Sequence, residues 1–208
     1  MCGRYVVKNP VTKTSSLVKS SIQVEDTVNY NAHPYQKLPV IKKYKNGNAL
    51  EALKWGLVPG WAKNKEFKAL INARLETIDE KVSFKKLIKN HRCVAVADGF
   101  YEWRRNENEK TPHYFVRKDT NVIYFAGIFE ENQFCLITEE AKENIREIHN
   151  RQPVILNQSD VNRYLNLELQ GSVFLNERKV PDLIFHEVSK DVNKPTNNTA
   201  SLIQKISS

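Results

Sequence analysis

The sequence predicts an α+β fold, in which one domain spanning residues 1–208 is built from mostly antiparallel sheets. We expect these sheets to curl into a barrel-like core with short peripheral helices. Three observations support this prediction. Five short apolar segments between residues 92 and 138 follow one another with polar turns between them. Asn46-Gly47, the strongest short-range signal for a β-hairpin, separates two further apolar segments. Segments with helical spacing are short, and neither a repeat nor a linker divides the chain.

The first ninety residues mix strands with short helices. Asn9-Pro10 is a typical helix start, while stretches rich in Gly, Pro and Asn predict loops. The expected elements, in order, are strand Gly3–Val7, helix Thr12–Ser20, loop Asn29–Pro34, strands Leu38–Lys45 and Ala49–Leu57, loop Trp55–Trp61 and helix Ser83–Asn90.

The second half of the chain reads mainly as strands. The expected elements are strands Arg92–Ala97, Phe100–Arg105, His113–Lys118, Val122–Phe129 and Phe134–Thr138, helix Glu139–His149, strand Pro153–Leu156, helix Ser159–Leu165 and strand Leu183–Val188. The tail from Lys190 onward is rich in Asn, Lys and Ser, so we expect it to be partly mobile.

Composition and charge favour a polyanionic partner. Hydrophobic residues at 40% and charged residues at 27% are ordinary for a globular protein. The 32 Lys and Arg outnumber the 24 Asp and Glu, for a net charge of +8. This excess favours nucleic acid as the partner, with a basic, well-solvated surface as the alternative. Because neither a signal peptide nor an apolar run of membrane-spanning length is found, we expect a cytoplasmic protein without a membrane role, nucleoid-associated if bacterial.

The three cysteines do not form a recognisable disulfide or zinc pattern. They are Cys2, Cys93 and Cys135, an odd number at wide spacing, which is typical of a reducing compartment. Cys93 and Cys135 lie in apolar runs and are expected to be inert core residues. His186-Glu187 lacks the second histidine of a zinc protease, and the sequence contains neither a nucleophile elbow nor a Walker loop or dinucleotide fingerprint.

Cys2 is the residue with the most distinctive chemistry. If an aminopeptidase removes Met1, Cys2 carries a free α-amine and a thiol on neighbouring carbons. Such an amine, with a pKa of about 7.7–8.0, is substantially unprotonated near neutral pH. It can condense with an aldehyde to an imine, which the thiol closes into a thiazolidine. The thiol could instead act alone in acyl transfer, with the amine as its base. The plainer alternative is that Cys2 is simply the second residue of a strand.

Two further residues suggest acid–base chemistry. Glu102 lies among three aromatic residues in Gly99-Phe-Tyr-Glu-Trp103, surroundings that disfavour its ionised form. The alternative is an outward-facing strand residue. His149 precedes a proline near an expected helix end, where it could act as an acid or base or merely cap the helix.

Several other polar and aromatic residues have two possible readings. Asn72 could be a functional amide or a turn residue, and Arg74 an anion ligand or a surface charge. Trp55 and Trp61 could belong to the core or form a platform on which a nucleobase stacks.

Seven motifs follow one another in a specific order. They are Met1-Cys-Gly-Arg-Tyr5, Asn29-Tyr-Asn31 with Pro34, Trp55-Gly-Leu-Val-Pro59, Asn72-Ala-Arg-Leu-Glu-Thr77, Gly99-Phe-Tyr-Glu-Trp103, Ala126-Gly-Ile128, and the pattern Ile-His-x-Arg-x-Pro-Val-Ile-Leu from Ile148 to Leu156. Together they resemble the SRAP family, the SOS-response-associated peptidases that are understood as abasic-site processing proteins. The resemblance extends from residue 1 to about residue 200, nearly the whole chain.

The resemblance implies a sensor of abasic sites in single-stranded DNA that shields the lesion through a reversible thiazolidine crosslink to Cys2. It implies that Glu102 moves protons on the amine and that His149 assists sugar-ring opening and crosslink reversal. The implied catalytic residues are Cys2, Asn72, Glu102 and His149. The implied DNA contacts are Arg4, Arg74 and Arg151 on phosphates, Trp61 and Pro39 as a wedge beneath unstacked bases, and Thr138 near the lesion. The family pattern requires neither a metal nor an organic cofactor, and we expect a monomer.

The chain departs from the family pattern at three positions. Asn150 and Gln152 replace the usual Asp and Met around Arg151, and Val96 replaces a common Pro. These departures bear on affinity and reversal rate more than on the chemistry.

Two other functions compete with the DNA crosslink. N-terminal-nucleophile hydrolases also begin Met-Cys-Gly, and such an enzyme could cleave the bond after its own first residue. A non-catalytic single-strand binder would use the aromatic residues and arginines alone.

Overall fold

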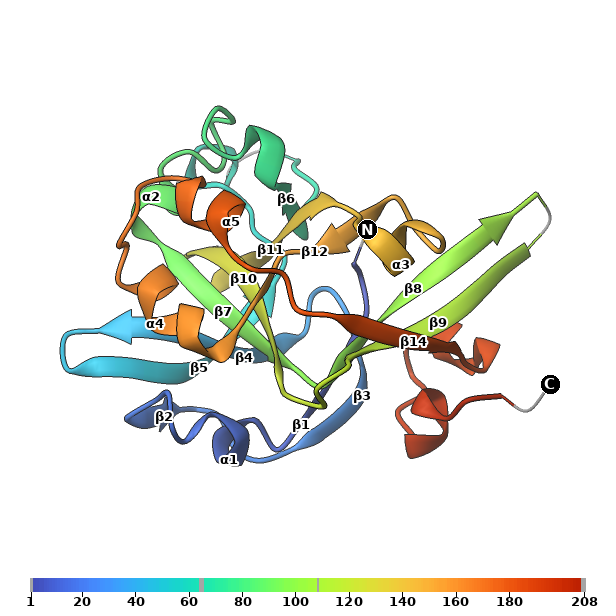
Figure 1. The fold of residues 1–208 in the computed structure, drawn as a ribbon. Coiled ribbons are helices and arrows are strands. Elements are labelled where there is room, and N and C mark those ends of the chain that lie inside the picture. The colour runs from blue at the N-terminus through green and yellow to red at the C-terminus, as the bar shows by residue number, and fades with distance from the viewer. Residues whose placement is uncertain (1, 64–65, 108, 207–208) are drawn as a thin grey trace.

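The computed structural model describes residues 2–63, 66–107 and 109–206. Two β-sheets form its body, with short helices at their margins (Figure 1). The strands are β1 (Tyr5–Lys8), β2 (Ser20–Ile22), β3 (Val28–Ala32), β4 (Lys37–Tyr44), β5 (Gly47–Trp55), β6 (Asn72–Arg74), β7 (Arg92–Ala97), β8 (Gly99–Asn106), β9 (Glu109–Arg117), β10 (Ile123–Glu130), β11 (Gln133–Glu140), β12 (Arg151–Pro153), β13 (Ile155–Leu156) and β14 (Leu183–Glu187). The α-helices are α1 (Pro10–Thr14), α2 (Leu87–Asn90), α3 (Glu143–Arg146), α4 (Gln158–Leu165) and α5 (Val173–Glu177), and the 3-10 turns are η1 (Gly60–Ala62), η2 (Leu75–Thr77), η3 (Lys190–Asn193) and η4 (Ala200–Ile203).

The larger sheet closes on itself. Its strands run in the order β12-β11-β10-β7-β4-β5-β2, with β13 beside β10 and β6 beside β11. A short parallel pairing of β11 with β5, Gln133 with Lys54 and Phe134 with Trp55, joins β5 back to β11. The result is a ring-like sheet rather than a strict barrel. The prediction of a single, mostly β domain with few short helices is confirmed, and the barrel-like core takes this ring form.

The smaller sheet places the start of the chain inside the protein. Its order is β14-β9-β8-β1-β3, antiparallel throughout. Tyr5 of β1 pairs with Phe100 of β8 on one side and with Ala32 of β3 on the other. Cys2, Tyr5 and Phe100 share one apolar cluster with Trp55 of the larger sheet. The core around Cys2 therefore lies between the two sheets.

A second core covers the other side of the ring-like sheet. Helices α2, α4 and α5 contribute apolar side chains to it, and these pack against residues of β4, β5 and β7. The two cores together account for the amphipathic spacing that predicted the short helices.

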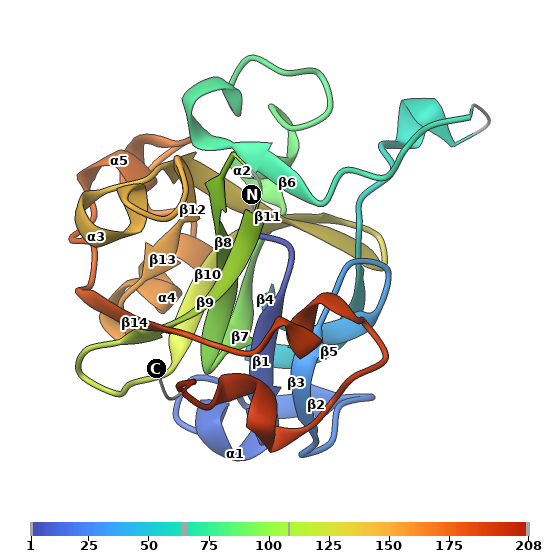
Figure 2. The same cartoon turned by 90° about the vertical axis from the view of Figure 1, so that its right-hand side faces the viewer.

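Two regions for which neither a strand nor a helix was predicted contain regular elements. The segment predicted as loop Asn29–Pro34 contains β3, because β1 supplies its backbone partners. Its Asn31 side chain is buried and donates to the carbonyls of Val192, Lys194 and Asn197 at 3.0–3.2 Å. The tail from Lys190, expected to be partly mobile, forms η3 and η4 across the smaller sheet (Figure 2). Its polar composition gave no sign that Val192 and Leu202 would be buried.

The predicted helix Glu139–His149 is wrong over most of its length. Strand β11 extends through Glu140, because residues 138–140 pair with β12, and only the four residues of α3 are helical. Helix α1 also stops early, at Thr14, and α2 covers only the end of the predicted helix Ser83–Asn90. Strands β2, β6 and β12 and helix α5 are too short to give a periodic signal, and the sequence did not predict them.

The two hairpins differ in how well the sequence predicted them. The β4–β5 hairpin is confirmed, although its two turn residues are Lys45 and Asn46, and Gly47 begins β5 with a positive φ of 129°. Strands β8 and β9 form a ribbon that extends beyond the rest of the smaller sheet (Figure 1). The outer part of this ribbon is polar, which explains why the predicted strands stopped short of it.

Candidate active site

Cys2 lies at the junction of the two sheets. Its side chain is fully buried, and the chain rises from β1 toward β6 and β11 (Figure 2). The side-chain amide of Asn72, the first residue of β6, donates to the Cys2 carbonyl at 3.1 Å. Among the described residues, the buried Oδ1 of Asn72 has no hydrogen-bond partner. Asn72 is therefore a strand residue that contacts Cys2 and retains an unused acceptor. Met1 lies outside the described residues.

Glu102 is a buried carboxyl group beside Cys2. It lies in β8 opposite His113 and is only 2% exposed, which overturns the alternative of an outward-facing strand residue. Burial raises the pKa of Glu102 to about 7. Burial and the negative charge of Glu102 together raise the pKa of the Cys2 thiol well above its ordinary value. At neutral pH Glu102 can thus gain or lose a proton, while Cys2 remains a thiol.

His149 follows α3 and faces two cavities. Its Nδ1 lies 3.0 Å from the backbone nitrogen and 3.1 Å from the carbonyl oxygen of Arg151, so the Arg151 backbone occupies this nitrogen in either tautomer of the ring. The ring therefore engages the chain that follows it instead of capping α3. Burial lowers the pKa of His149, so the neutral ring predominates at pH 7.

Two adjoining cavities surround these groups. The first has a volume of about 330 Å³, and its lining comprises Gly3, Arg4, Glu102, Trp103, Arg105, Lys110, His149 and Asn193. The second has a volume of about 610 Å³, and its lining comprises Arg74, Glu76, Thr77, Arg105, Glu140, His149, Asn150 and Arg151. Both cavities share Arg105 and His149. Each contains arginine side chains that the sequence predicted as phosphate ligands.

The two arginines of the second cavity are held differently. Arg151 binds both carboxylate oxygens of Glu76, at 2.7 and 3.0 Å, and donates to the carbonyl of Thr138 at 2.8 Å. Although burial opposes it, the hydrogen bond from Arg151 holds the pKa of Glu76 below its ordinary value. The Arg74 side chain is exposed and forms no hydrogen bond or ion pair with another described residue. Arg151 is thus oriented in advance, whereas Arg74 is available.

In the first cavity, the tail of the chain holds Arg4. Its Nη1 donates to Oδ1 of Asn31 at 2.8 Å and to the Val192 carbonyl at 3.4 Å. The indole of Trp103 donates to the Asn193 side chain at 2.8 Å. The ordered tail therefore shapes one wall of this cavity.

Three other predicted contacts have different surroundings. Thr138 is fully buried, and its hydroxyl accepts from Arg151 at 3.2 Å, so it supports Arg151 from within the sheet. Trp61 is 51% exposed and packs edge-on against Phe67, beside a cavity of about 270 Å³ that Lys85 and Lys86 also line.

Pro39 does not fit the wedge that was predicted with Trp61. It is buried inside β4, between β5 and β7. A side chain in that position cannot insert beneath a base without opening the sheet. Trp55, the other tryptophan with two readings, is a core residue whose indole donates to the Ile71 carbonyl at 2.9 Å.

Of the three departures from the family pattern, two lie away from the two cavities of the candidate site. Gln152 is buried, donates to Glu139 at 2.8 Å and accepts from the Lys142 backbone at 2.9 Å, so it secures the chain before α3. Val96 is a core residue. Only Asn150 is exposed and lines the second cavity.

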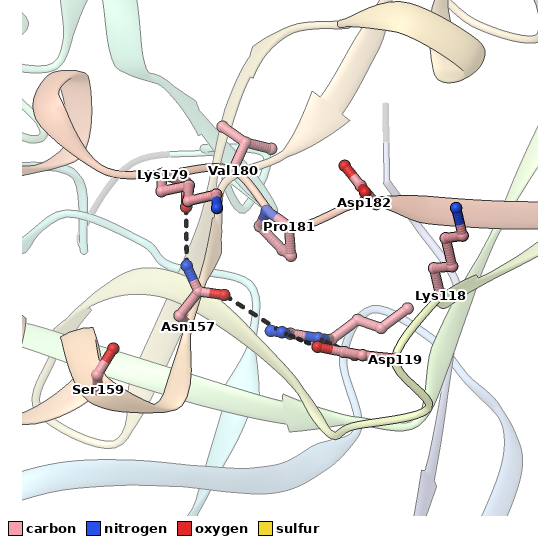
Figure 3. Close-up of a pocket in the computed structure, with 9 residues that line it drawn as sticks. Lys118, Asp119, Asn157, Ser159, Lys179, Val180, Pro181 and Asp182 are labelled. Atoms are coloured by element: carbon pink, nitrogen blue, oxygen red, sulfur yellow. Dashed lines mark hydrogen bonds and ion pairs between the residues drawn. The ribbon is translucent and has the colours of Figure 1, made fainter.

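A further cavity, of about 560 Å³, lies where the β9–β10 turn meets the segments before α4 and β14 (Figure 3). Its buried Arg117 donates to both oxygens of Asp119, at 2.8 and 2.6 Å, and to Asn157 at 3.2 Å. Asn157 in turn donates to the Lys179 carbonyl at 2.9 Å. Its buried polar groups are thus satisfied by one another.

Glu76 and Arg105 are among the cavity residues to which the sequence assigned no role. Glu76 lies within a quoted motif without an assigned role, and Arg105 is three residues after Glu102. No local pattern links either residue to Cys2. Within the described residues, no group of His, Cys, Asp and Glu side chains is placed to hold a metal ion, and no helix is long and apolar enough to cross a membrane.

Comparison with known proteins gives consistent matches. Residues 1–195 match the family model described as SOS response associated peptidase (SRAP). The chain is 32% identical to the abasic site processing protein YoqW of Bacillus subtilis, over 98% of this chain and 99% of that protein. It is 34% identical to the abasic site processing protein YobE of the same organism, over 94% of this chain and 97% of that protein.

A solved structure has the same fold. A crystal structure of a Bacteroides thetaiotaomicron protein superposes with a TM-score of 0.84, at 24% identity, covering 99% of this chain and all of that one. This similarity establishes the fold alone.

Proposed function

The chain belongs to the SOS response associated peptidase family, and we propose that it binds abasic sites in single-stranded DNA and bonds to them reversibly through Cys2. The protein acts after Met1 has been removed. The observation that carries this proposal is a buried carboxyl group, Glu102, whose pKa is about 7 and whose charge acts on the Cys2 thiol. A proton carrier with a pKa near the working pH is what reversible imine chemistry requires.

The reaction begins at the α-amine of Cys2. The amine attacks the aldehyde carbon of the opened abasic sugar, and the resulting carbinolamine loses water to give an imine. The thiol sulfur then adds to the imine carbon, while the imine nitrogen gains a proton and the thiol loses one. A five-membered thiazolidine results, and no atom is oxidised or reduced. Glu102 takes protons from the amine and returns them to the oxygen that leaves as water, and it then takes the thiol proton and returns it to the ring nitrogen.

The state of the thiol favours this chemistry over peptide hydrolysis. Acyl transfer by a cysteine requires the thiolate, whereas burial and Glu102 hold the Cys2 pKa high. In the thiazolidine reaction the amine reacts first, and the thiol meets an already electrophilic carbon with a base beside it. The competing function, an N-terminal-nucleophile peptidase, would need a group that lowers this pKa.

His149 is suited to the sugar. An abasic sugar is mostly a closed ring, whose oxygen must gain a proton as the aldehyde forms. With Nδ1 occupied by the Arg151 backbone, Nε2 is the nitrogen that can exchange a proton with a ligand. Asn72 fixes the Cys2 backbone and offers its free acceptor to the α-amine or the hydroxyl of the carbinolamine.

The cations favour a single strand as the ligand. Arg4 in one cavity and Arg74 and Arg151 in the other can bind successive phosphates. Trp61, more than half exposed, can stack on a base. The overall charge of +8 adds a general attraction for DNA.

The test is an incubation with a single-stranded oligonucleotide that carries one abasic site. Intact-mass measurement first establishes that Met1 is absent. We expect a protein–DNA band that survives denaturing electrophoresis, disappears with Cys2→Ala and persists with the matched control Cys93→Ala, which alters a buried cysteine of the core. Binding without such a band would indicate a non-catalytic single-strand binder. Cleavage of peptides without a band would indicate the peptidase.

A further inference from the structure

Arg105 stands between the two cavities of the candidate active site. It lies near the outer end of β8, directly opposite Lys110 in the β8–β9 ribbon. Among the described residues, only Arg105 and His149 line both cavities. The side chain is exposed, and within the described part of the chain it forms no hydrogen bond or ion pair. An exposed guanidinium group beside a cavity is available to an anionic ligand.

The cations in the two cavities indicate the path of a bound DNA strand past Arg105. Arg4 lines the first cavity, while Arg74 and Arg151 line the second. A strand whose phosphates contact cations in both cavities must cross the wall that they share. That wall consists of Arg105 and His149, next to the position of the reacting sugar. The phosphate attached to that sugar must therefore pass close to Arg105.

Resting on the proposed function, we infer that Arg105 is a further DNA-binding residue, whose guanidinium binds the phosphate next to the abasic sugar. Lys110, across the ribbon and lining the first cavity, extends this basic surface in the direction of Arg4. The ribbon is thus part of the DNA-binding surface. Sequence analysis placed three arginines on phosphates, and the ribbon supplies a fourth.

Electrostatics agree with this position. Burial is the main cause of the lowered pKa of His149, and the positive charge of Arg105 adds to it. The same charge partly offsets the effect of burial on the pKa of Glu102. The positive charge of the neighbouring Arg104 instead contributes to the lowered pKa of His113, whose main cause is burial. Arg104 lines neither cavity. Arg104 is therefore a matched control, with the same charge one residue away.

The experiment measures binding without crosslinking. A single-stranded oligonucleotide with a tetrahydrofuran in place of the abasic sugar has no aldehyde, so its affinity can be followed over a range of salt concentrations. For single strands the logarithm of affinity falls with a slope of about −0.7 per neutralised phosphate. We expect Arg105→Gln to reduce this slope by about 0.7, Arg105→Lys to restore most of it, and Arg104→Gln to leave it unchanged.

Two results would overturn the inference. If neither glutamine variant changed the slope, Arg105 would not bind phosphate. If both reduced it equally, the ribbon would contribute only diffuse charge. Circular dichroism of each variant verifies folding. The parent protein's denaturation-resistant band on a genuine abasic site tests the proposed function separately, so the two failures are distinguishable.

Discussion

The active-site cavities and the cavity beside Arg117 are both large and polar, but their charges are organised in opposite ways. Around Arg117, donors and acceptors pair within the protein, with bidentate contacts to Asp119 and a further bond to Asn157 (Figure 3). Around Cys2, the described residues include an unused buried acceptor on Asn72 and two available guanidinium groups, Arg74 and Arg105.

This difference distinguishes polar groups that hold the chain in place from polar groups that are available to a ligand. A buried charge that is paired inside the protein stabilises or positions the chain, but it offers nothing to a ligand. A buried carboxyl with a pKa raised to about 7, as in Glu102, costs stability in order to be available for chemistry. Cavity volume does not make this distinction, since the Arg117 cavity has a volume comparable to those of the active site.

The largest effect is expected from Glu102→Gln. Loss of the proton carrier should slow crosslink formation about 10²-fold or more. In the parent protein the rate should rise with pH through about 7, because Glu102 must be ionised to accept a proton, and this step should vanish in the variant. Single-turnover kinetics between pH 5 and pH 8.5 measure both. A parent rate that is flat through pH 7 would remove Glu102 from the mechanism.

The same substitution should stabilise the protein. The folded pKa of about 7 exceeds the ordinary value of 4.5, so stability is highest below pH 4.5 and is lost as pH rises toward 7. That loss amounts to about 3 kcal/mol. Glu102→Gln should therefore melt at a higher temperature than the parent at pH 8 and at nearly the same temperature at pH 4. Glu109→Gln, an exposed change on the same ribbon, is the control.

His149→Ala should have a smaller effect that acts in both directions. Without a group to exchange protons with the sugar, formation and reversal should both slow by about tenfold or more. A preformed crosslink, challenged with excess unlabelled abasic DNA, should persist longer than in the parent. Release at the parental rate would exclude the acid role.

Asp119→Ala tests the Arg117 cavity, where the polar groups pair with one another. It leaves the buried Arg117 with a single side-chain partner, Asn157. Because Asp119 is itself half-exposed, we expect a loss of only about 1–2 kcal/mol in the free energy of unfolding. Crosslinking should be unchanged. Reduced crosslinking by the folded variant would mean that the Arg117 cavity is coupled to the active site.

The smallest effect is expected from Glu76→Gln. It removes the carboxylate that pairs with Arg151 and competes with phosphate for it. Affinity for the tetrahydrofuran oligonucleotide should rise about two- to fivefold, which corresponds to roughly 0.5–1 kcal/mol for an exposed pair. Glu80→Gln, an exposed acid that lines neither cavity, is the control. Weaker binding would show instead that Glu76 is needed to orient Arg151.

The sequence singled out residues that the fold brings together, but it did not predict every residue that lines the cavities around them. The quoted motifs contain Cys2, Asn72, Glu102 and His149, and the chemistry of these residue types can be inferred from the sequence alone. Their meeting point depends on the pairing of β6 with β11 and of β1 with β8, which no local pattern encodes. Arg105 and Glu76 join the site only through that topology.

Because local patterns do not encode strand pairing, the fold and the surroundings of the expected DNA contacts also differ from the prediction. Trp55 and Trp61 are identical residues six positions apart, yet one belongs to the core and the other is half-exposed. Pro39 is buried because β4 has a neighbouring strand on each side, β5 and β7. The sequence does not show this pairing, so Pro39 was expected to reach DNA. The helix expected from Glu139 yielded to strand pairing, since tertiary contacts override a weak local preference.

The central position of β1 has a consequence for how the protein is made. Its partner β8 follows roughly a hundred residues later, so at about 5–20 residues per second the first residues wait roughly 5–20 seconds on the ribosome before they can be enclosed. An aminopeptidase has that interval to remove Met1, because Cys2 is afterwards fully buried. If the proposed chemistry at Cys2 holds, the active fraction is decided during translation, and synthesis that outpaces the aminopeptidase would yield folded molecules without a reactive terminus.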